Sequence, residues 1–460
     1  MTSTASIRAS RTGWRTLFLK EDWWAIWIGL GLLAAAILLF DAGASMKWIA
    51  VTPKKWHTID QLLFQLQDNA GRYALLFGLW AGVLGIAVHA LGIDLRHFLP
   101  AFLFIYGVSL LIFFLGEWDR AHDYNLEPPL VALALGLVIA NFGKLPAWIE
   151  SGLRVEFYIK TGIVLLGATL PFTLILWAGP VAITQATIVS LATFGTIFWA
   201  GKKLGLDRRL AATLGAGGAV CGVSASIAIA GAVGAKKEHA PISISLVVFW
   251  AIAMIFALPL AARSLGLPTG VAGAWIGTSE FADAAGLAAA QAYGGYAGNV
   301  PGVTGNPEAA VRAFTLMKVI GRDVWIGIWA LVLSVVATTR WEQTGIQGRA
   351  GIGEIWRRFP KFVIGFLLAS LAVTAIAQSH SFADYKNIVE PNLVAPLRNL
   401  RTWAFIFCFF SIGLTTRLSA FTRAGAKPFY AFTLGVAVNV TLGYVLSTRV
   451  FSGFWTALGQ

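Results

Sequence analysis

Long apolar segments recur along the whole chain, separated by short charged loops. A membrane-spanning helix needs about 20 mostly apolar residues. Only 12% of the 460 residues are charged, whereas soluble proteins carry roughly 25%. The chain has too little charge to cover a water-facing surface, so we expect an all-α polytopic membrane protein with about 13 transmembrane helices. The expected spans are 23–42, 72–92, 98–116, 128–141, 157–176, 180–200, 210–234, 241–262, 268–292, 312–339, 360–378, 398–416 and 428–451.

The net charge of +13 is concentrated in a few loops. In a soluble protein this charge would suggest a nucleic-acid partner, but Lys and Arg of membrane proteins gather in cytoplasmic loops. The basic loops are 201–209, 340–359 and 417–427, together with the N-terminal tail. We therefore expect a cytoplasmic N-terminus, no nucleic-acid partner and, after an odd number of spans, a periplasmic C-terminus. The pairs Lys54-Lys55 and Lys236-Lys237 are exceptions to this pattern.

The segments in which glycines interrupt an apolar run, described below, all follow residue 125. We expect residues 1–120 to form an N-terminal extension with three transmembrane helices and an interfacial loop, and residues 121–460 to form a core of about ten transmembrane helices. Within this core, residues 160–173 resemble residues 402–416. The two segments are expected to run in opposite directions, which is typical of inverted repeats in secondary transporters.

Four glycines fall within eight residues of the segment 214–228. Each costs up to about 1 kcal/mol in a helix relative to Ala, so a break is predicted. Unwound backbone at membrane depth is tolerated only where protein buries it or where it lines a cavity, and the N–H groups that start the next half-helix attract anions. The alternative is close helix packing through small residues. The candidate substrate-binding residues here are Gly217, Gly218, Cys221, Gly222, Ser224 and Ser226.

A second break is predicted within residues 273–286, where Glu280 and Asp283 interrupt an apolar run. Unpaired carboxylates at membrane depth tend to face a water-filled cavity or to be protonated. Either residue could therefore carry a coupling proton. The alternative is that this break lies near the outer surface and the carboxylates cap a helix.

Lys318 and Arg322 are four residues apart, on one face of the apolar segment 312–339. Two cations repel each other unless an anion lies between them, and Asp323 or a transported anion could supply it. We treat both cations as candidate substrate ligands and Asp323 as a third candidate for proton coupling. The alternative is a salt-bridge network with Glu280 or Asp283.

Four segments together resemble a known family. They are residues 160–167, residues 219–226, the helix with Lys318 and Arg322, and residues 410–416. The chain resembles the YeiH-type sulfate exporter family of conserved bacterial inner-membrane proteins over roughly residues 125–450. Where that family carries a Ser-x-His-(Glu/Asp) pattern, this chain has Phe281 at the histidine position, so no role of that histidine carries over.

The resemblance implies a secondary active transporter that exports a small anion (sulfate, sulfite or an organic sulfonate) across the inner membrane by alternating access. It also implies an architecture similar to the sodium/proton antiporters and bile-acid symporters, with two discontinuous crossing helices. The expected partners are the substrate and the lipid bilayer, and a homodimer is possible.

The alternative function is a cation/proton antiporter, in which Glu280, Asp283 and Asp323 bind Na⁺. We expect no enzymatic activity, because the six histidines form no cluster and no nucleophile motif is present. Cys221 and Cys408 lie in apolar runs, which argues against a disulfide or a Cys metal site. No cofactor is expected beyond a coupling ion, H⁺ or Na⁺.

Overall fold

The computed structural model describes residues 21–121, 126, 128–143, 145–323, 325–341, 361–381, 384–417 and 425–459. The N-terminal tail and most of the basic loops 340–359 and 417–427 lie outside these residues. The described part of the chain is almost entirely helical and contains no strand. Seven helices in it are long and apolar enough to cross a membrane. They are α1 (Glu21–Asp41), α2 (Ile59–Ala90), α3 (Leu95–Gly116), α6 (Phe172–Lys203), α9 (His239–Ser264), η7 (Tyr385–Val394) continued by α17 (Ala395–Thr415), and α18 (Ala426–Val445) continued by η9 (Leu446–Val450).

The remaining helices are shorter, and the expected thirteen continuous spans are not found among the described residues. Expected spans 210–234 and 268–292 each divide into two helices. The shorter helices are η2 (Met46–Trp48), α4 (Pro128–Phe142), η4 (Ala147–Gly152), α5 (Val155–Gly167), α7 (Arg208–Ala219), α8 (Val223–Ala232), α10 (Thr269–Ser279), α11 (Asp283–Tyr296), α12 (Pro307–Thr315), the π-helical η5 (Leu316–Arg322), α13 (Trp325–Val336), η6 (Ala337–Trp341), α15 (Phe362–Gln378) and α19 (Ser452–Ala457).

Helices α7 and α8 fold back on each other. Arg209 Nη1, at the start of α7, donates to the carbonyl oxygen of Gly234, just after the end of α8, at 2.6 Å. A straight pair of this length would place these residues more than 30 Å apart at about 1.5 Å per residue. The two helices therefore form a re-entrant hairpin, which we call hairpin 1.

Helices α10 and α11 form a second such hairpin. Tyr293 Oη, near the end of α11, donates to the carbonyl oxygen of Leu267, just before α10, at 2.5 Å. We call this pair hairpin 2. The expectation that segments 210–234 and 268–292 cross the membrane as discontinuous helices is therefore wrong. Their half-helices are too short to span a hydrocarbon core of about 30 Å, and the chain reverses at each break.

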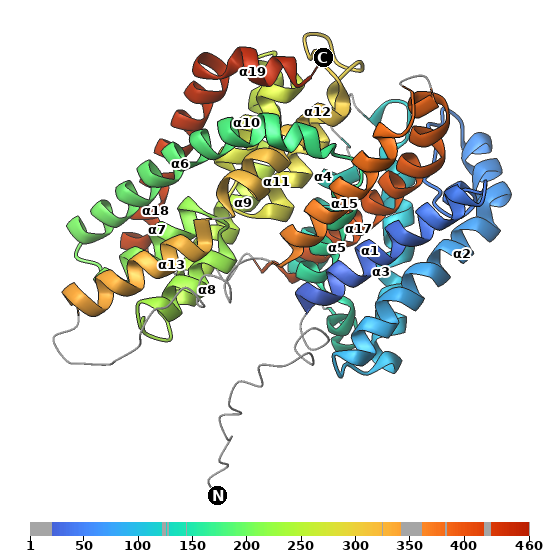
Figure 1. Ribbon diagram of the computed structural model, residues 1–460. Helices are drawn as coiled ribbons and strands as arrows, with labels where there is room; N and C mark the ends of the chain where they lie inside the picture. The colour runs from blue at the N-terminus through green and yellow to red at the C-terminus, as the bar shows by residue number, and fades with distance from the viewer. Residues whose placement is uncertain are drawn as a thin grey trace, which may run out of the picture.

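The two hairpins begin at opposite ends of the bundle. Helix α9 joins them, and its 26 residues span about 39 Å. In Figure 1, α8 accordingly lies low and the loop before α12 lies at the top. Lys236 and Lys237, at the base of hairpin 1, thus share an end with Lys202 and Lys203, so this pair is no longer an exception to the charge pattern.

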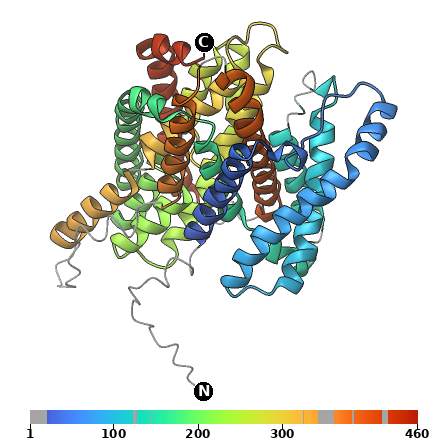
Figure 2. The same cartoon turned by 45° about the vertical axis from the view of Figure 1, so that its right-hand side comes forward.

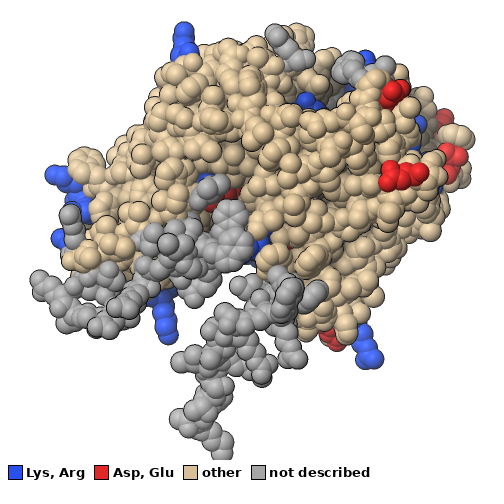
Figure 3. Space-filling model, viewed as in Figure 1, with Lys and Arg blue, Asp and Glu red and all other residues tan. Residues whose placement is uncertain are grey.

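The surface between the two ends is apolar. The face seen in Figure 3 is almost entirely free of charged atoms, which lie mostly toward its edges. Exposed Leu111 belongs to α3, and exposed Leu176 and Leu191 belong to α6. Because water-soluble proteins rarely expose so wide an apolar surface, we expect this belt to face lipid.

The first three helices lie along one side of the molecule (Figures 1 and 2) and are attached to the rest. The segment after α1 packs on α17, where Trp403 Nε1 donates to Val51 O at 2.8 Å and Asn399 Nδ2 donates to Ala50 O at 2.8 Å. The ring of Trp80 on α2 packs edge-on against Phe407 of α17. The N-terminal extension therefore shares a hydrophobic core with the remainder of the chain.

The similar segments 160–173 and 402–416, and the helices that follow them, contact each other. Helix α5 lies against α17, and α6 lies against α18. Asn439 Nδ2 donates to Thr193 Oγ1 at 3.0 Å, and Gln185 Nε2 donates to Ser447 Oγ at 2.7 Å. These buried amides join neighbouring helices, and the pairing is compatible with the expected repeat.

Candidate functional site

The tips of the two hairpins meet inside the bundle. Hairpin 1 reverses at residues 220–222, and hairpin 2 at residues 280–282. Gly222 has φ +66° and ψ −108°, a conformation that side-chain-bearing residues rarely adopt. A Cβ there would lie 2.7 Å from the carbonyl oxygen of Phe281 in hairpin 2. Glycine is therefore required both for the turn and for the contact between the tips.

Lys318, on the π-helical segment η5, holds both tips. Its side chain is fully buried. The ammonium donates to the carbonyl oxygens of Val220 at 2.9 Å, Phe281 at 3.1 Å and Glu280 at 3.3 Å. Asp283 Oδ1 lies 3.4 Å from Nζ. One cation thus binds main-chain oxygens from two hairpins that enter from opposite ends.

Arg322, one helical turn further on, has the same role. Its Nη1 donates to the carbonyl oxygens of Thr278 at 2.8 Å and Glu280 at 2.9 Å, and its Nη2 to that of Gly218 at 3.3 Å. These oxygens end α10 and α7. The last carbonyls of a helix lack intrahelical donors and carry its partial negative charge. The two cations therefore neutralise the C-terminal ends of both first half-helices.

This geometry bears on the expected role of the cations. Neither Lys318 nor Arg322 lines the cavities beside the tips. Their donors are directed at the protein's own carbonyls, and the Lys318–Asp283 pair corresponds to the alternative salt-bridge interpretation. Both residues therefore bind the hairpin tips and do not form part of a cavity wall.

Two adjoining cavities of about 370 Å³ each lie beside the tips. Glu156, Cys221, Ser224 and Asp283 line both. Ligand pockets are typically ~300–1,000 Å³, so each has room for a small molecule. The first is also lined by α9 and by the end of α17, and the second by Asp22, Lys160, Asp323, Ile326 and Phe362, among others.

The N-terminal ends of both second half-helices line the first cavity. These are Val223 and Ser224 of α8, and Ala282 to Ala285 at the start of α11. The N-cap residues Gly222 and Ala282 make no side-chain cap. The first N–H groups of a helix carry its partial positive charge and bind anions. The cavity therefore has the positive ends of two helices on its wall.

Carboxylates occupy other parts of the wall. Asp323 is 1% exposed, and neither of its oxygens has a hydrogen-bond partner among the described residues. Asp283 lines both cavities, but Glu280 lines neither. Glu280 Oε1 instead accepts from the N–H groups of Phe281 at 2.9 Å and Ala282 at 3.2 Å. Glu280 thus stabilises its own turn, whereas Asp283 and Asp323 face the cavities.

Among the glycine-segment candidates, Cys221 and Ser224 line the cavities, whereas Gly217, Gly218 and Ser226 do not. Gly217 and Gly218 lie within α7 rather than in unwound backbone. A Cβ on Gly217 would lie 2.6 Å from Ser226 Oγ, and that hydroxyl is 2.8 Å from Ser243 Oγ. Gly217 therefore allows the two arms of hairpin 1 to pack closely, whereas Gly218 faces Ile197 of α6.

Sequence reasoning missed Asp22 and Glu156 on the wall. Both pair with Lys160, whose Nζ lies 2.6 Å from Asp22 Oδ1 and 3.2 Å from Glu156 Oε2. The available signal was the Glu156–Lys160 spacing of four residues at the start of an apolar run. Nothing in the sequence links Asp22 to this site. The described residues include no group of three or more His, Cys, Asp or Glu side chains that could hold a metal.

The chain has many relatives of similar sequence. A profile of the family described as conserved hypothetical protein 698 matches residues 100–432. A UPF0324 membrane protein of Rhodopirellula baltica is 32% identical over 386 residues, covering 81% of this chain and 68% of the relative. One of Nitratidesulfovibrio vulgaris is 31% identical, covering 84% and 66%. One of Nitrosomonas europaea is 28% identical, covering 92% and 94%.

The chain thus spans about two thirds of the length of the first two relatives. The names of all three state a membrane protein and no substrate. No solved structure matches the chain significantly.

Proposed function

The chain belongs to the bacterial membrane protein family described as conserved hypothetical protein 698, and we propose that it is a secondary active transporter of a small anion. The observation that carries this proposal is the cavity bordered by two uncapped helix N-termini. Each N-terminus has a partial charge of roughly +0.5. The opposing C-terminal charges are neutralised by Lys318 and Arg322.

The donors at this cavity suit an oxyanion. The N–H groups at the starts of α8 and α11 and the hydroxyl of Ser224 surround one space. Sulfate, sulfite and organic sulfonates present several acceptor oxygens to such a set, and a helix N-terminus is a ready-made site for them. We propose these anions as the substrate class and export across the inner membrane as the direction, in keeping with the family resemblance.

Asp283 and Asp323 supply the coupling in this proposal. With Lys318 and Arg322 they form a group of two cations and two carboxylates around the tips. An anion that enters adds charge to a buried site, which is costly unless a proton enters with it. A carboxylate on the cavity wall can take that proton and release it with the substrate.

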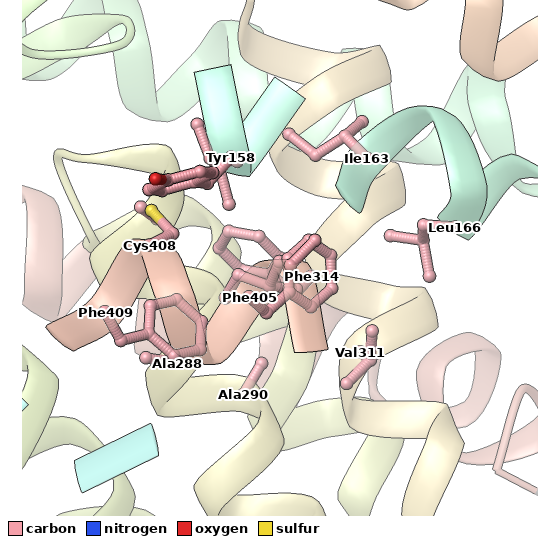
Figure 4. Close-up of a cluster of buried hydrophobic side chains, with 14 of the residues drawn as sticks. Tyr158, Ile163, Leu166, Ala288, Ala290, Val311, Phe314, Phe405, Cys408 and Phe409 are labelled. Carbon is pink, nitrogen blue, oxygen red and sulfur yellow. The ribbon is translucent and has the colours of Figure 1, made fainter. Parts of the chain in front are cut away.

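We infer that access to the site is from one end of the molecule. The cavities are lined by the starts of α1 and α5 and by the end of α17, through Asp22, Glu156 and Arg417. This end carries the base of hairpin 1 and its basic loops, which we expect to be cytoplasmic. Toward the other end the path is closed by packed side chains of α5, α11, α12 and α17, including Ile163, Phe314 and Phe405 in Figure 4. Opening this cluster and closing the cavities would complete alternating access.

A cation/proton antiporter is the second candidate. Asp323 has two buried oxygens without partners in the described residues, and Asp22, Glu156 and Asp283 line the same cavities. Such oxygens could ligate Na⁺. The anion proposal assigns these carboxylates to protons instead.

Measurements of anion flux across proteoliposome membranes and of sulfate binding distinguish the anion transporter from the cation/proton antiporter. Ser224→Asp adds a tethered carboxylate at the second residue of α8, where the helix dipole favours it. This variant should melt no lower than the wild type and should lose flux and the sulfate binding at the hairpin-tip site. Ser224→Asn is the neutral control and should retain both. Na⁺-dependent proton movement without any dependence on an anion would refute the anion proposal and support the antiporter.

A further inference from the structure

A second cluster of charges lies away from the hairpin tips. Glu308, at the start of α12, meets two arginines of α17. Arg401 Nη2 donates to Glu308 Oε1 at 3.2 Å, and Arg401 Nη1 to Oε2 at 3.3 Å. Arg398 Nε lies 3.8 Å from Glu308 Oε1, and Arg398 Nη2 donates to Glu390 at 2.9 Å. The Glu308 carboxylate thus fills a fork of guanidinium groups.

A third arginine completes the cluster without a hydrogen bond of its own. Arg312 lies one turn after Glu308 on α12, and the charges acting on it include Glu308, Arg398 and Arg401. Among the described residues it makes no hydrogen bond or ion pair within 4 Å, and its buried Nε has no partner. The Nε atoms of Arg398 and Arg401 also lack hydrogen-bond partners there.

The positive charge of the cluster exceeds the negative charge of its own carboxylates. Three guanidinium groups face two carboxylates, which leaves one positive charge and several unused donors. A buried donor left unpaired costs about 1–3 kcal/mol, and like charges held together add to that cost. Guanidinium groups bind oxyanions bidentately. A multiply charged oxyanion would therefore accept hydrogen bonds from the unpaired donors and balance the excess positive charge.

The position of the cluster relates it to the hairpin-tip cavities. Helix α17 carries Arg401 near one end and Thr415 at the other, where it lines the first cavity. The 14 residues between them rise about 21 Å. Helix α5 also runs from Glu156 at the cavity toward Thr169, whose hydroxyl accepts from Arg401 Nη1 at 3.0 Å. Ile163 of α5 and Phe405 and Phe409 of α17, labelled in Figure 4, lie between these ends along the two helices.

The cluster is reachable from outside. The side chains of Arg398, Glu308 and Glu390 are each about one quarter to one third exposed. A further cavity of about 290 Å³, lined by Thr169 and Tyr385, adjoins the cluster. None of the three arginines lines this cavity, and Thr169, which accepts from Arg401, connects it to the cluster.

We propose that Arg312, Arg398 and Arg401 form a second oxyanion site at the mouth opposite the hairpin-tip cavities. In the absence of an anion, the Glu308 carboxylate occupies this site, which we call the arginine cradle. An incoming divalent oxyanion displaces that carboxylate. The position of this site on a transport path rests on the proposed function, whereas the site itself does not. Free sulfate and a lipid headgroup phosphate share the required chemistry.

Sulfate titration calorimetry on the full-length protein in detergent tests the proposal. Glu308→Gln removes the competing carboxylate while keeping the shape, and should tighten sulfate binding at one site about tenfold. Arg312→Gln should weaken the same site about tenfold, and Arg312→Lys should recover part of that loss. Lys386→Gln removes an exposed positive charge from the neighbouring η7 and should leave binding unchanged.

The outcomes distinguish this proposal from its alternatives. A purely structural ion-pair cluster would lose melting temperature in Glu308→Gln without gaining affinity, and that result would overturn the proposal. Ser224→Asp tests the hairpin-tip site alone, so retention of the Arg312-dependent site in that variant supports two separate sites. Repeating the titration in lipid nanodiscs identifies the source of the anion: weaker sulfate binding only with anionic lipid would assign the cradle to a headgroup phosphate.

Discussion

Replacing Lys318 by Met would test whether this buried cation is a structural cap of the hairpins. The substitution keeps the length of the side chain and removes its charge and donors. Glu280 O would keep its hydrogen bond from Arg322, but Val220 O and Phe281 O would lose the donor that they share. A buried acceptor without a partner costs about 1–3 kcal/mol. We therefore expect Lys318→Met to destabilise the protein by about 2–6 kcal/mol.

The melting temperature of the purified protein in detergent measures this effect. At roughly 2 °C per kcal/mol for a long chain, Lys318→Met should melt about 4–12 °C lower. Asp283→Asn is the matched variant, since it removes the carboxylate partner of Lys318 and leaves the carbonyl bonds intact. Asp283→Asn should lower the melting temperature by less than half as much as Lys318→Met. A wild-type melting temperature in Lys318→Met, or an equal loss in Asp283→Asn, would refute the capping role.

Three further predictions follow from the tips and the cavity wall. Gly222→Ala should destabilise by about 2–6 kcal/mol through backbone strain and overpacking, whereas Gly231→Ala, with open space around it, should not lower the melting temperature. A small thiol reagent should modify Cys221, which lines both cavities, and not the fully buried Cys408; mass spectrometry showing equal labelling would contradict the cavity. Asp323→Asn should retain sulfate binding in titrations but reduce the proton movement that accompanies anion flux, and unchanged proton movement would exclude Asp323 as the carrier.

The positions of both breaks could be predicted from the sequence, but the direction of the chain after each break could not. Clustered glycines and carboxylates within apolar runs indicate that a regular helix is unfavourable there. Whether the chain continues or reverses depends on the dihedral angles of three residues at each tip. Two signals did favour reversal: the half-helices are too short to span a bilayer, and Lys236-Lys237 disagrees with the charge pattern that a crossing would require.

The partners of the buried cations were less predictable than the cations themselves. Lys318 and Arg322 in an apolar helix require compensation, and sequence reasoning looked for it among anions and carboxylates. Main-chain carbonyls at helix C-termini have no sequence signature, since every residue carries one. Asp22 could not be assigned to the cavity for a related reason: it lies 134 residues from Glu156 in the chain, and only the packing of α1 on α5 brings the two together.

The shared attachment of both tips to η5 restricts how the protein can move. Glu280 O accepts from Lys318 and Arg322 at once, and each cation also reaches hairpin 1. Pulling the tips apart would expose several buried carbonyls in a setting without water. The two hairpins and η5 must consequently travel together as one rigid piece, so the hinges for any conformational cycle have to lie in the connections that join this piece to the surrounding helices.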